Sequence, residues 1–209
     1  MLFLAIFYAI LVIGEAMKPL LVATKNIHKI KEIKNALEPL GFRICSLLDF
    51  EPSMTIEETG STFEENAYLK AIACFETYQI PTLADDSGLE VFALDMRPGV
   101  YSQRYSASGT DQDNLDKLLL EMNDITDRRA RFVAVLCYIG SDKKPIYIRE
   151  ECYGEIASKP VYQNGFGYDP IFFLPTQSHM FSQLTIDEKN QISHRGKALH
   201  RLREMLGGL

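Results

Sequence analysis

The amino-acid sequence predicts an α/β fold built on a mixed β-sheet. Residues 18–23 form a short apolar run, and after a polar turn Ile30 and Ile33 begin a pattern with helical spacing. This order of strand, tight turn and helix is typical of parallel connections. Further along, residues 131–139 and 145–156 are long apolar or alternating runs that indicate an antiparallel pair. A chain with both kinds of connection is expected to form one mixed sheet with flanking helices.

The other elements follow from local patterns. The predicted strands lie at residues 42–45, 81–84, 89–94 and 171–174, and the predicted helices at 61–78, at 111–122 and from 194 onward. Ser61 with Glu64 has the spacing of a capping box, and so does Thr62 with Glu65. Residues 85–88, Asp-Asp-Ser-Gly, are expected to break the strand that precedes them.

Composition narrows the class of protein. The 209 residues include 22 Lys and Arg against 28 Asp and Glu, for a formal net charge of −6. A hydrophobic content of 46% and a charged content of 24% are typical of a globular chain and exclude a disordered one. The acidic balance argues against a protein that coats nucleic acid, but it permits a small anionic ligand at a locally basic site. The four cysteines have no metal-binding or redox spacing, which favours reduced thiols in a cytoplasmic protein.

The first sixteen residues differ from the rest of the chain. Residues 1–13 are an unbroken apolar run, shorter than the ~20 residues that span a bilayer and without the basic residues of a signal peptide. A rarely used upstream start, a weak export signal and a surface anchor are the alternatives, and the missing basic residues favour the first. We expect one domain over residues 17–209, with residues 1–16 outside the fold and no stable membrane association.

The turn at residues 24–29 lies between the first strand and the first helix. Free backbone N–H groups and the positive end of a helix converge at such a turn, and Lys29 adds a full charge. This combination suits a polyphosphate, although the chain has no GxxxxGK[ST] motif. The alternative is a capped surface helix with solvated lysines.

Four carboxylates form a second candidate group: Glu57, Glu58, Asp85 and Asp86. Two carboxylates from separate segments can hold Mg²⁺, which completes its coordination with phosphate oxygens and water. Asp86 is expected where a strand ends, a place where open α/β sheets position ligand groups. The alternative is ordinary turn chemistry. On the capped helix, Thr62, Asn66 and Lys70 recur every four residues and share one face. Lys70, which has apolar neighbours, either reaches solvent or faces an anion.

Two segments near the C-terminus suit a nucleobase. Phe166 lies between two glycines that free the backbone to present its ring for stacking, and Asp169 can accept hydrogen bonds from a base. His194 and Arg195 stand in the first turn of the last helix, where the dipole disfavours cations. Their presence there indicates an anion or a carbonyl as partner. The alternative for the first segment is a glycine hairpin with core aromatics.

Taken together, these groups resemble the inosine triphosphate pyrophosphatase family, whose members remove non-canonical purine nucleoside triphosphates from the nucleotide pool. The resemblance covers residues 18–206 and includes five motifs in the order of the family. The motifs are Thr24-x-Asn26-x-x-Lys29-x-x-Glu32, Glu57-Glu58-Thr59-Gly60 with Phe63-x-Glu65-Asn66-x-x-x-Lys70-Ala71, Ala84-Asp85-Asp86-Ser87-Gly88-Leu89, Gly165-Phe166-Gly167-Tyr168-Asp169-Pro170, and Ser193-His194-Arg195-Gly196. One departure is Gln183, where members often carry Glu.

The resemblance implies two lobes around a central nucleotide cleft, a homodimer, and Mg²⁺-dependent hydrolysis of ITP, dITP and XTP at the α-phosphorus to the monophosphate and pyrophosphate. By position, Glu57 and Asp86 would hold the metal, and Asp86 would be the proton acceptor. Lys70 and Ser87 would contact phosphate. The triphosphate would be lined by Thr24, Lys25, Asn26, Ile27, His28 and Lys29. The base pocket would be shaped by Phe166, Gly167, Tyr168, Asp169, Lys189, His194 and Arg195, with the ring of Phe166 stacked on the base.

In this interpretation, Lys29 and Lys70 offset charge on the leaving pyrophosphate, and Lys189 and Arg195 donate to the 6-keto oxygen of the base. Two other classes stay open. One is a related pyrophosphatase that acts on modified pyrimidine nucleotides, against which the base-pocket motifs argue. The other is a non-catalytic nucleotide sensor, against which the intact set of carboxylates and lysines argues.

Overall fold

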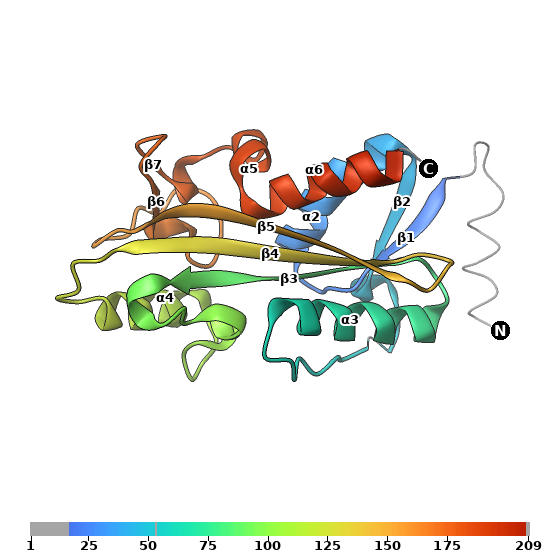
Figure 1. Ribbon diagram of the computed structural model, residues 1–209, viewed down its shortest axis with the longest axis horizontal. Coiled ribbons are helices and arrows are strands. Elements are labelled where there is room, and N and C mark those ends of the chain that lie inside the picture. The colour runs from blue at the N-terminus through green and yellow to red at the C-terminus, as the bar shows by residue number, and fades with distance from the viewer. Residues whose placement is uncertain (1–16, 53, 208–209) are drawn as a thin grey trace.

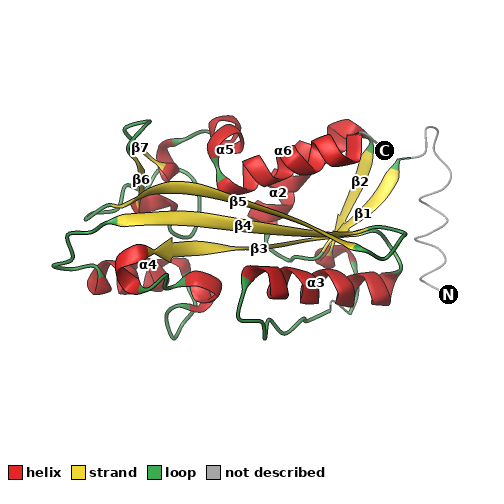
Figure 2. Cartoon of the chain, viewed as in Figure 1, coloured by secondary structure: helices red, strands yellow, loops and turns green. Residues whose placement is uncertain are grey.

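The computed structural model describes residues 17–52 and 54–207, which form an open, seven-stranded sheet with helices on both faces (Figures 1 and 2). The strand order is β2-β1-β3-β4-β5-β6-β7. The strands are β1 (Lys18–Val22), β2 (Phe42–Ser46), β3 (Thr82–Val91), β4 (Arg129–Ile139), β5 (Pro145–Ile156), β6 (Phe172–Leu174) and β7 (His179–Met180). The α-helices are α2 (Ile27–Leu37), α3 (Phe63–Tyr78), α4 (Asp111–Glu121), α5 (Ile186–Ile192) and α6 (His194–Gly207). Short 3₁₀ segments connect them, among them η4 (Gly99–Arg104).

The sheet is mixed, as predicted. β1 pairs in parallel with β2 and with β3, whereas the pairs from β3 to β7 are antiparallel. The predicted antiparallel pair is confirmed as β4 and β5, in register from Arg129↔Glu155 to Ile139↔Pro145. The sequence patterns missed the short elements α5 and β7, because neither is long enough to establish a period.

Helices cover both faces of the sheet (Figure 1). α3 packs against β3 and β4 on one face. On the other, α6 packs against β4 and β5, and α2 packs against α6 and β2. Since side chains alternate along a strand, β4 supplies Val133 and Val135 to the core under α3, and Ala134 and Leu136 to the core under α6. This burial on two faces explains why β4 is a nearly continuous apolar run rather than an alternating one.

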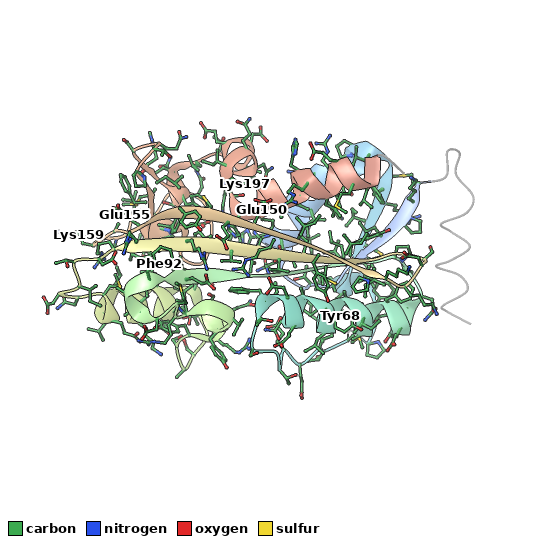
Figure 3. All side chains as sticks on the ribbon, in the orientation of Figure 1. Tyr68, Phe92, Glu150, Glu155, Lys159 and Lys197 are labelled. Atoms are coloured by element: carbon green, nitrogen blue, oxygen red, sulfur yellow. The ribbon has the colours of Figure 1, made fainter. Side chains whose placement is uncertain are left out.

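A third core fills the other end of the molecule, beneath α4. Phe132, Phe172 and Phe181 form its centre, with ring centroids 4.5 to 5.5 Å apart. β4 and β5 run through both ends and join the two lobes (Figure 2). On the outer side of β5, Arg201 of α6 binds Glu150 at 2.7 Å, and Figure 3 shows Lys197 beside the same strand.

One of the two predicted capping boxes is confirmed. Thr62 caps α3, accepting a hydrogen bond from the N–H of Glu65, whose carboxylate accepts from the N–H of Thr62. The predicted pairing of Ser61 with Glu64 is wrong. The Ser61 N–H and hydroxyl also donate to Glu65, at 2.6 and 2.8 Å, because a helix starting at Phe63 places only Glu65 within reach.

The predicted strand break at residues 85–88 is wrong, since β3 continues through it. β4 pairs with β3 residue by residue from Thr82↔Ile139 to Val91↔Ala130, and this ladder outweighs the turn preference of Asp-Asp-Ser-Gly. On its other side β3 pairs with β1 only at Thr82 and Leu83. The two aspartates therefore lie in the middle of β3 but beyond the carboxyl end of β1. The cleft opens at this point, where β3 has no neighbouring strand on the β1 side among the described residues.

The four cysteines are free, and burial raises the pKa of each thiol, to about 11 for Cys45 and Cys152 and about 12 for Cys74 and Cys137. This agrees with the prediction of reduced, unreactive thiols. Among the described residues, no helix is both long and apolar enough to cross a membrane. The predictions for residues 1–16 lie outside the described residues.

Candidate active site

Two cavities meet where β1 ends beside β3. The aromatic cavity, of about 90 Å³, has walls that include Phe132, Phe166, Tyr168 and His194. The charged cavity, of about 370 Å³, has walls that include Lys29, Glu58, Lys70 and Asp85. Asn26, Lys29 and Gln103 line both. The two cavities are therefore neighbouring parts of one cleft, which confirms the expected cleft between the lobes.

Asp85 is the centre of a buried charge network on the α2 and α6 side of β3. Lys29 Nζ lies 2.6 Å from Asp85 Oδ1, Arg195 Nε lies 2.7 Å from Oδ2, and the Ser87 hydroxyl donates to Oδ1 at 2.9 Å. Burial alone would raise the pKa of Asp85, but Arg195 and Lys29 outweigh burial and hold that pKa well below its usual range. Asp85 thus stays ionised and fixes two cations at the floor of the cleft.

Asp86 faces the opposite side of the sheet, toward α3. Lys70 Nζ lies 2.6 Å from Asp86 Oδ1 and 2.9 Å from Glu58 Oε1. Burial raises the pKa of Asp86, and Lys70 only partly opposes this. Burial acts on Glu58 in the same direction, but Lys70 and Arg104 outweigh it and lower the pKa of Glu58. Two neighbouring carboxylates with different pKa values can divide the roles of proton acceptor and permanent anion.

The structure brings Glu58 into this cluster, and not Glu57, whose side chain is exposed. Arg104 fixes this choice, because it binds the Glu58 carboxylate at 3.0 Å and donates to the Glu58 carbonyl oxygen at 3.3 Å. The buried Asn66 holds the end of the same segment by accepting from the N–H of Gly60 at 2.8 Å. Glu57, the carboxylate expected to hold a metal, thus lies outside this cluster, and Glu58 lies beside Lys70 in its place.

One face of α3 organises this side of the cleft. Thr62, Asn66 and Lys70 share that face, as their spacing predicts. Thr62 caps the helix, Asn66 holds Gly60, and Lys70 reaches the two carboxylates. Lys70 is buried and bound to Asp86 and Glu58, so of the two alternatives for its ammonium the structure supports the anion and excludes snorkelling.

Asn26 caps α2 from the turn before it. Asn26 Oδ1 accepts from the N–H groups of His28 and Lys29 at 2.9 and 3.2 Å, and the N–H of Asn26 donates to Thr24 at 3.1 Å. Residues that line the charged cavity from this turn are Thr24, Lys25, Asn26 and Lys29. Ile27 points to solvent, and the ring of His28 stacks against Phe166. The six residues of the turn therefore do not share one orientation.

The Phe166 loop is held to the wall of the aromatic cavity by Asp169. The Asp169 carboxylate accepts from the N–H of Phe166 at 2.9 Å and binds Lys189 Nζ at 2.6 Å. Burial raises the pKa of Asp169 against the opposing effect of Lys189. Gly165 adopts a φ of 86°, and a side chain there would collide with the Asp169 carboxylate, so this position requires glycine. The loop thus places an aromatic face and a charged pair together.

His194 and Tyr168 complete the aromatic cavity. The His194 ring stacks on Phe132, with centroids 4.8 Å apart and an interplanar angle of 14°. Burial, together with Arg195 and Lys189, lowers the pKa of His194 well below 6.5, so the residue is neutral. Its Nδ1 is buried and has no hydrogen-bond partner among the described residues. The hydroxyl of Tyr168 donates to the carbonyl oxygen of Ser102 at 2.9 Å, which fixes the wall opposite.

Of the two kinds of partner expected for Arg195, an anion or a carbonyl, the structure shows anions. Its guanidinium binds Asp85 at 2.7 Å and Glu32 at 2.8 Å, and it donates to the hydroxyl of Ser87 at 2.8 Å. The conflict with the helix dipole was a correct sign of an anionic partner, but the anions belong to the protein. Arg195 still lines the aromatic cavity, where it is 2% exposed.

Sequence reasoning gave no role to three residues that shape the cleft, although Glu32 belongs to the first motif. Glu32 follows Lys29 by one helical turn, and that spacing was a usable signal because both side chains then share a face. Arg104 and Gln103 belong to η4, inside a segment rich in Gly, Ser and Tyr that has no periodic pattern. The close tertiary contact of Gly88 with η4, which leaves no space for a side chain, helps to bring these residues to the cleft.

Comparison with known proteins identifies the class to which this fold and site belong. The model of the Ham1 family matches residues 20–205, and the chain belongs to that family. A dITP/XTP pyrophosphatase of Bacillus cereus is 44% identical over 197 residues, covering 92% of this chain and 96% of the relative. A dITP/XTP pyrophosphatase of Halalkalibacterium halodurans is 45% identical over 193 residues, covering 91% and 100% of the two chains.

Solved structures agree in fold. The Staphylococcus aureus Ham1 protein is similar with a TM-score of 0.83 and 41% identity, over 91% of this chain and 99% of that protein. A HAM1 protein from Coxiella burnetii is similar with a TM-score of 0.85 and 38% identity, over 92% of this chain and 100% of that protein. The long mixed sheet with two lobes is therefore the fold of this family.

Proposed function

We propose that this protein hydrolyses non-canonical purine nucleoside triphosphates, namely ITP, dITP and XTP, to the monophosphate and pyrophosphate. The observation that carries the proposal is the Asp86–Lys70–Glu58 cluster at one end of a cleft whose other end is aromatic. The names of the relatives, which describe pyrophosphatases for dITP and XTP, support the same activity. Removal of such nucleotides keeps them out of the nucleotide pool.

The nucleotide fits the cleft in one direction. The aromatic cavity offers the ring of Phe166 and the neutral ring of His194 to a purine, while the charged cavity offers Lys29 and the capped end of α2 to phosphates. The N-terminus of a helix binds phosphate through its free N–H groups and its dipole. Lys29 lines both cavities, so the sugar and α-phosphate pass beside it.

The proposal includes Mg²⁺, and the donor set fits this ion. Among the described residues there is no cluster of three or more acidic, histidine or cysteine side chains that could hold a metal. Mg²⁺ does not require one, since it binds through one or two carboxylates together with substrate phosphates and water. Asp86 and Glu58, which share one ammonium, would supply those carboxylates. When bound, the ion would neutralise phosphate charge and acidify water.

The protein's own groups then divide the chemistry. Asp86, with its raised pKa, accepts a proton from the attacking water, as suits a general base. Lys70 is buried, and its pKa is raised because Asp86 and Glu58 outweigh the effect of burial, so it stays charged beside the reacting phosphate. Lys29 and the α2 turn bind the pyrophosphate that leaves.

Discrimination of the base follows from polar groups at the aromatic cavity. Lys189 can donate a hydrogen bond to a 6-keto oxygen. It cannot donate to the 6-amino group of adenine, because that group is itself a donor. His194 Nδ1, which lacks a partner in the described part of the chain, is a second group that a base can satisfy. Arg195 contributes by fixing Asp85 and Ser87 rather than through a free guanidinium.

The test is turnover of ITP, dITP, XTP, GTP and ATP, with modified pyrimidine triphosphates alongside, measured by release of pyrophosphate in Mg²⁺. We expect the first three to be cleaved much faster than ATP. Preference for a pyrimidine nucleotide, or binding without turnover, would instead support the related pyrophosphatase or the sensor. The proposal also expects a homodimer in the cytoplasm, which sedimentation and cell fractionation can check.

A further inference from the structure

A contact between two rings joins the two sides of the cleft. His28, the second residue of α2, stacks on Phe166, with ring centroids 4.7 Å apart and an interplanar angle of 14°. His28 comes from the turn that faces the charged cavity, whereas Phe166 belongs to the wall of the aromatic cavity. The exposed imidazole of His28 thus reaches away from the phosphate side and toward the base side.

The ring of Phe166 depends on such a partner for its orientation. Gly165 and Gly167 flank it with φ values of 86° and 59°. Asp169 and Asp111 anchor this loop through the N–H groups of Phe166 and Gly167, at 2.9 and 2.8 Å. These bonds hold the main chain, but they leave the side-chain torsions of Phe166 free. Contacts on the two faces of the ring must therefore select its rotamer.

The two faces have different neighbours. Lys189 Nζ lies 4.8 Å from the Phe166 centroid, and Lys189 lines the aromatic cavity. His28 is not among the residues that line this cavity. At these distances one face of a phenyl ring accommodates one partner, so His28 and Lys189 lie on opposite faces of Phe166. A base that stacks on the cavity face then takes the place of the Lys189 ammonium, which can move to the edge of the base.

We propose that His28 is a positioning residue for the base: it holds the ring of Phe166 in the orientation in which a purine stacks on it. The bound state is then a three-layer stack of His28, Phe166 and purine. This inference rests on the proposed function. It assigns His28 to the base, whereas the family resemblance assigned it to the triphosphate. It also links the base loop to the helix end that binds phosphate.

The experiment compares His28→Ala, His28→Phe and, as a matched control on the exposed face of α2, Lys31→Ala. Three quantities are measured for each: kcat and KM with ITP, the dissociation constant of IMP by calorimetry, and inhibition by inorganic tripolyphosphate. His28→Ala is expected to raise the KM for ITP and the dissociation constant of IMP about 3- to 10-fold, the range for loss of one aromatic stacking contact. Its kcat should stay within about twofold and its inhibition by tripolyphosphate should not change, because only base contacts are affected. His28→Phe should restore both constants, and Lys31→Ala should match the wild type.

Three results would overturn this assignment. If His28→Ala weakens the binding of tripolyphosphate and of ITP equally, His28 contacts the phosphates. Failure of His28→Phe to restore binding would exclude ring stacking as the cause, and wild-type constants in His28→Ala would exclude any positioning role. Failure of the proposed function is a separate result, because the wild type itself would then leave ITP uncleaved, while the titrations with IMP would still report on the stack.

Discussion

Asp85 and Asp86 are adjacent residues of one strand, yet they belong to two different environments. Asp85 points toward α2 and α6, where Arg195 and Lys29 hold its pKa well below the usual range despite burial. Asp86 points toward α3, where burial raises its pKa and Lys70 is its ion-pair partner. The alternation of side chains along β3 separates the two carboxylates to opposite faces.

The difference teaches that the same residue type can organise a site or react in it. Both oxygens of Asp85 accept hydrogen bonds from protein groups, which fix the carboxylate in place. Asp86 shares Lys70 with Glu58 on the side where α3 borders the charged cavity, and its raised pKa favours proton uptake. Asp85 is thus a structural anion, and Asp86 is the carboxylate that we propose as the proton acceptor in the reaction.

The largest expected effect is on stability, from Asp85→Asn. The amide cannot neutralise Arg195 and Lys29, so two buried cations lose their shared anion. Loss of one partner from a buried ion pair costs about 3–5 kcal/mol. Urea unfolding should show a decrease of that size in the free energy of unfolding. If the variant is as stable as the wild type, Asp85 is not the structural anion of this pair.

Arg195→Ala should affect catalysis without selecting between bases. Because Arg195 binds Asp85, Glu32 and Ser87, its loss disturbs the floor of the cleft for every nucleotide. Removal of a charged hydrogen bond is expected to lower kcat/KM about 10- to 150-fold. The ratio of kcat/KM for ITP to that for ATP should stay nearly constant. A loss confined to ITP would return Arg195 to direct recognition of the base.

A smaller effect concerns the neutral His194. Its pKa is well below 6.5 in the folded state, so only the unfolded chain takes up a proton near that pH. The stability that the neutral His194 contributes is therefore present above pH 6.5 and is lost as the pH decreases below it. Between pH 7.5 and 5.5 the free energy of unfolding should fall by about 1.4 kcal/mol more in the wild type than in His194→Gln. Parallel pH profiles for the two proteins would show that His194 is protonated in the folded state.

The smallest expected effect is from removal of residues 1–16. Every residue of the two carboxylate environments follows Met17, and the first family motif begins at Thr24, after β1. The truncated protein should keep the wild-type kcat and melt within about 2 °C, which corresponds to less than about 1 kcal/mol. A clear drop in melting temperature would assign these residues a role in the fold or in an assembly.

The sequence was most informative where a local pattern determines geometry. The spacing of Thr62, Asn66 and Lys70 predicts one shared face of a helix, and Asn26 has the chemistry of a helix cap. In both cases the contacts lie within a few residues along the chain. The antiparallel pair β4 and β5 was equally accessible, because its two patterns are long.

The sequence was least informative where a distant contact decides between neighbours. Glu57 and Glu58 are chemically equal, and only Arg104, from another part of the chain, turns Glu58 toward Lys70. Likewise Asp-Asp-Ser-Gly is a good turn sequence, and only pairing with β4 keeps it extended. Such choices depend on tertiary structure, which no local preference contains.

The most direct test of the account is kcat of Asp86→Asn with ITP, measured together with thermal unfolding. The change keeps the volume of the side chain and removes the proton acceptor, while Lys70 retains Glu58 and the carbonyl oxygen of Asp85 as partners. The account predicts a loss in kcat of at least ~10²-fold, the lower range for a general base, with a melting temperature close to that of the wild type. A variant that keeps near-wild-type kcat would contradict the assignment of Asp86 to chemistry.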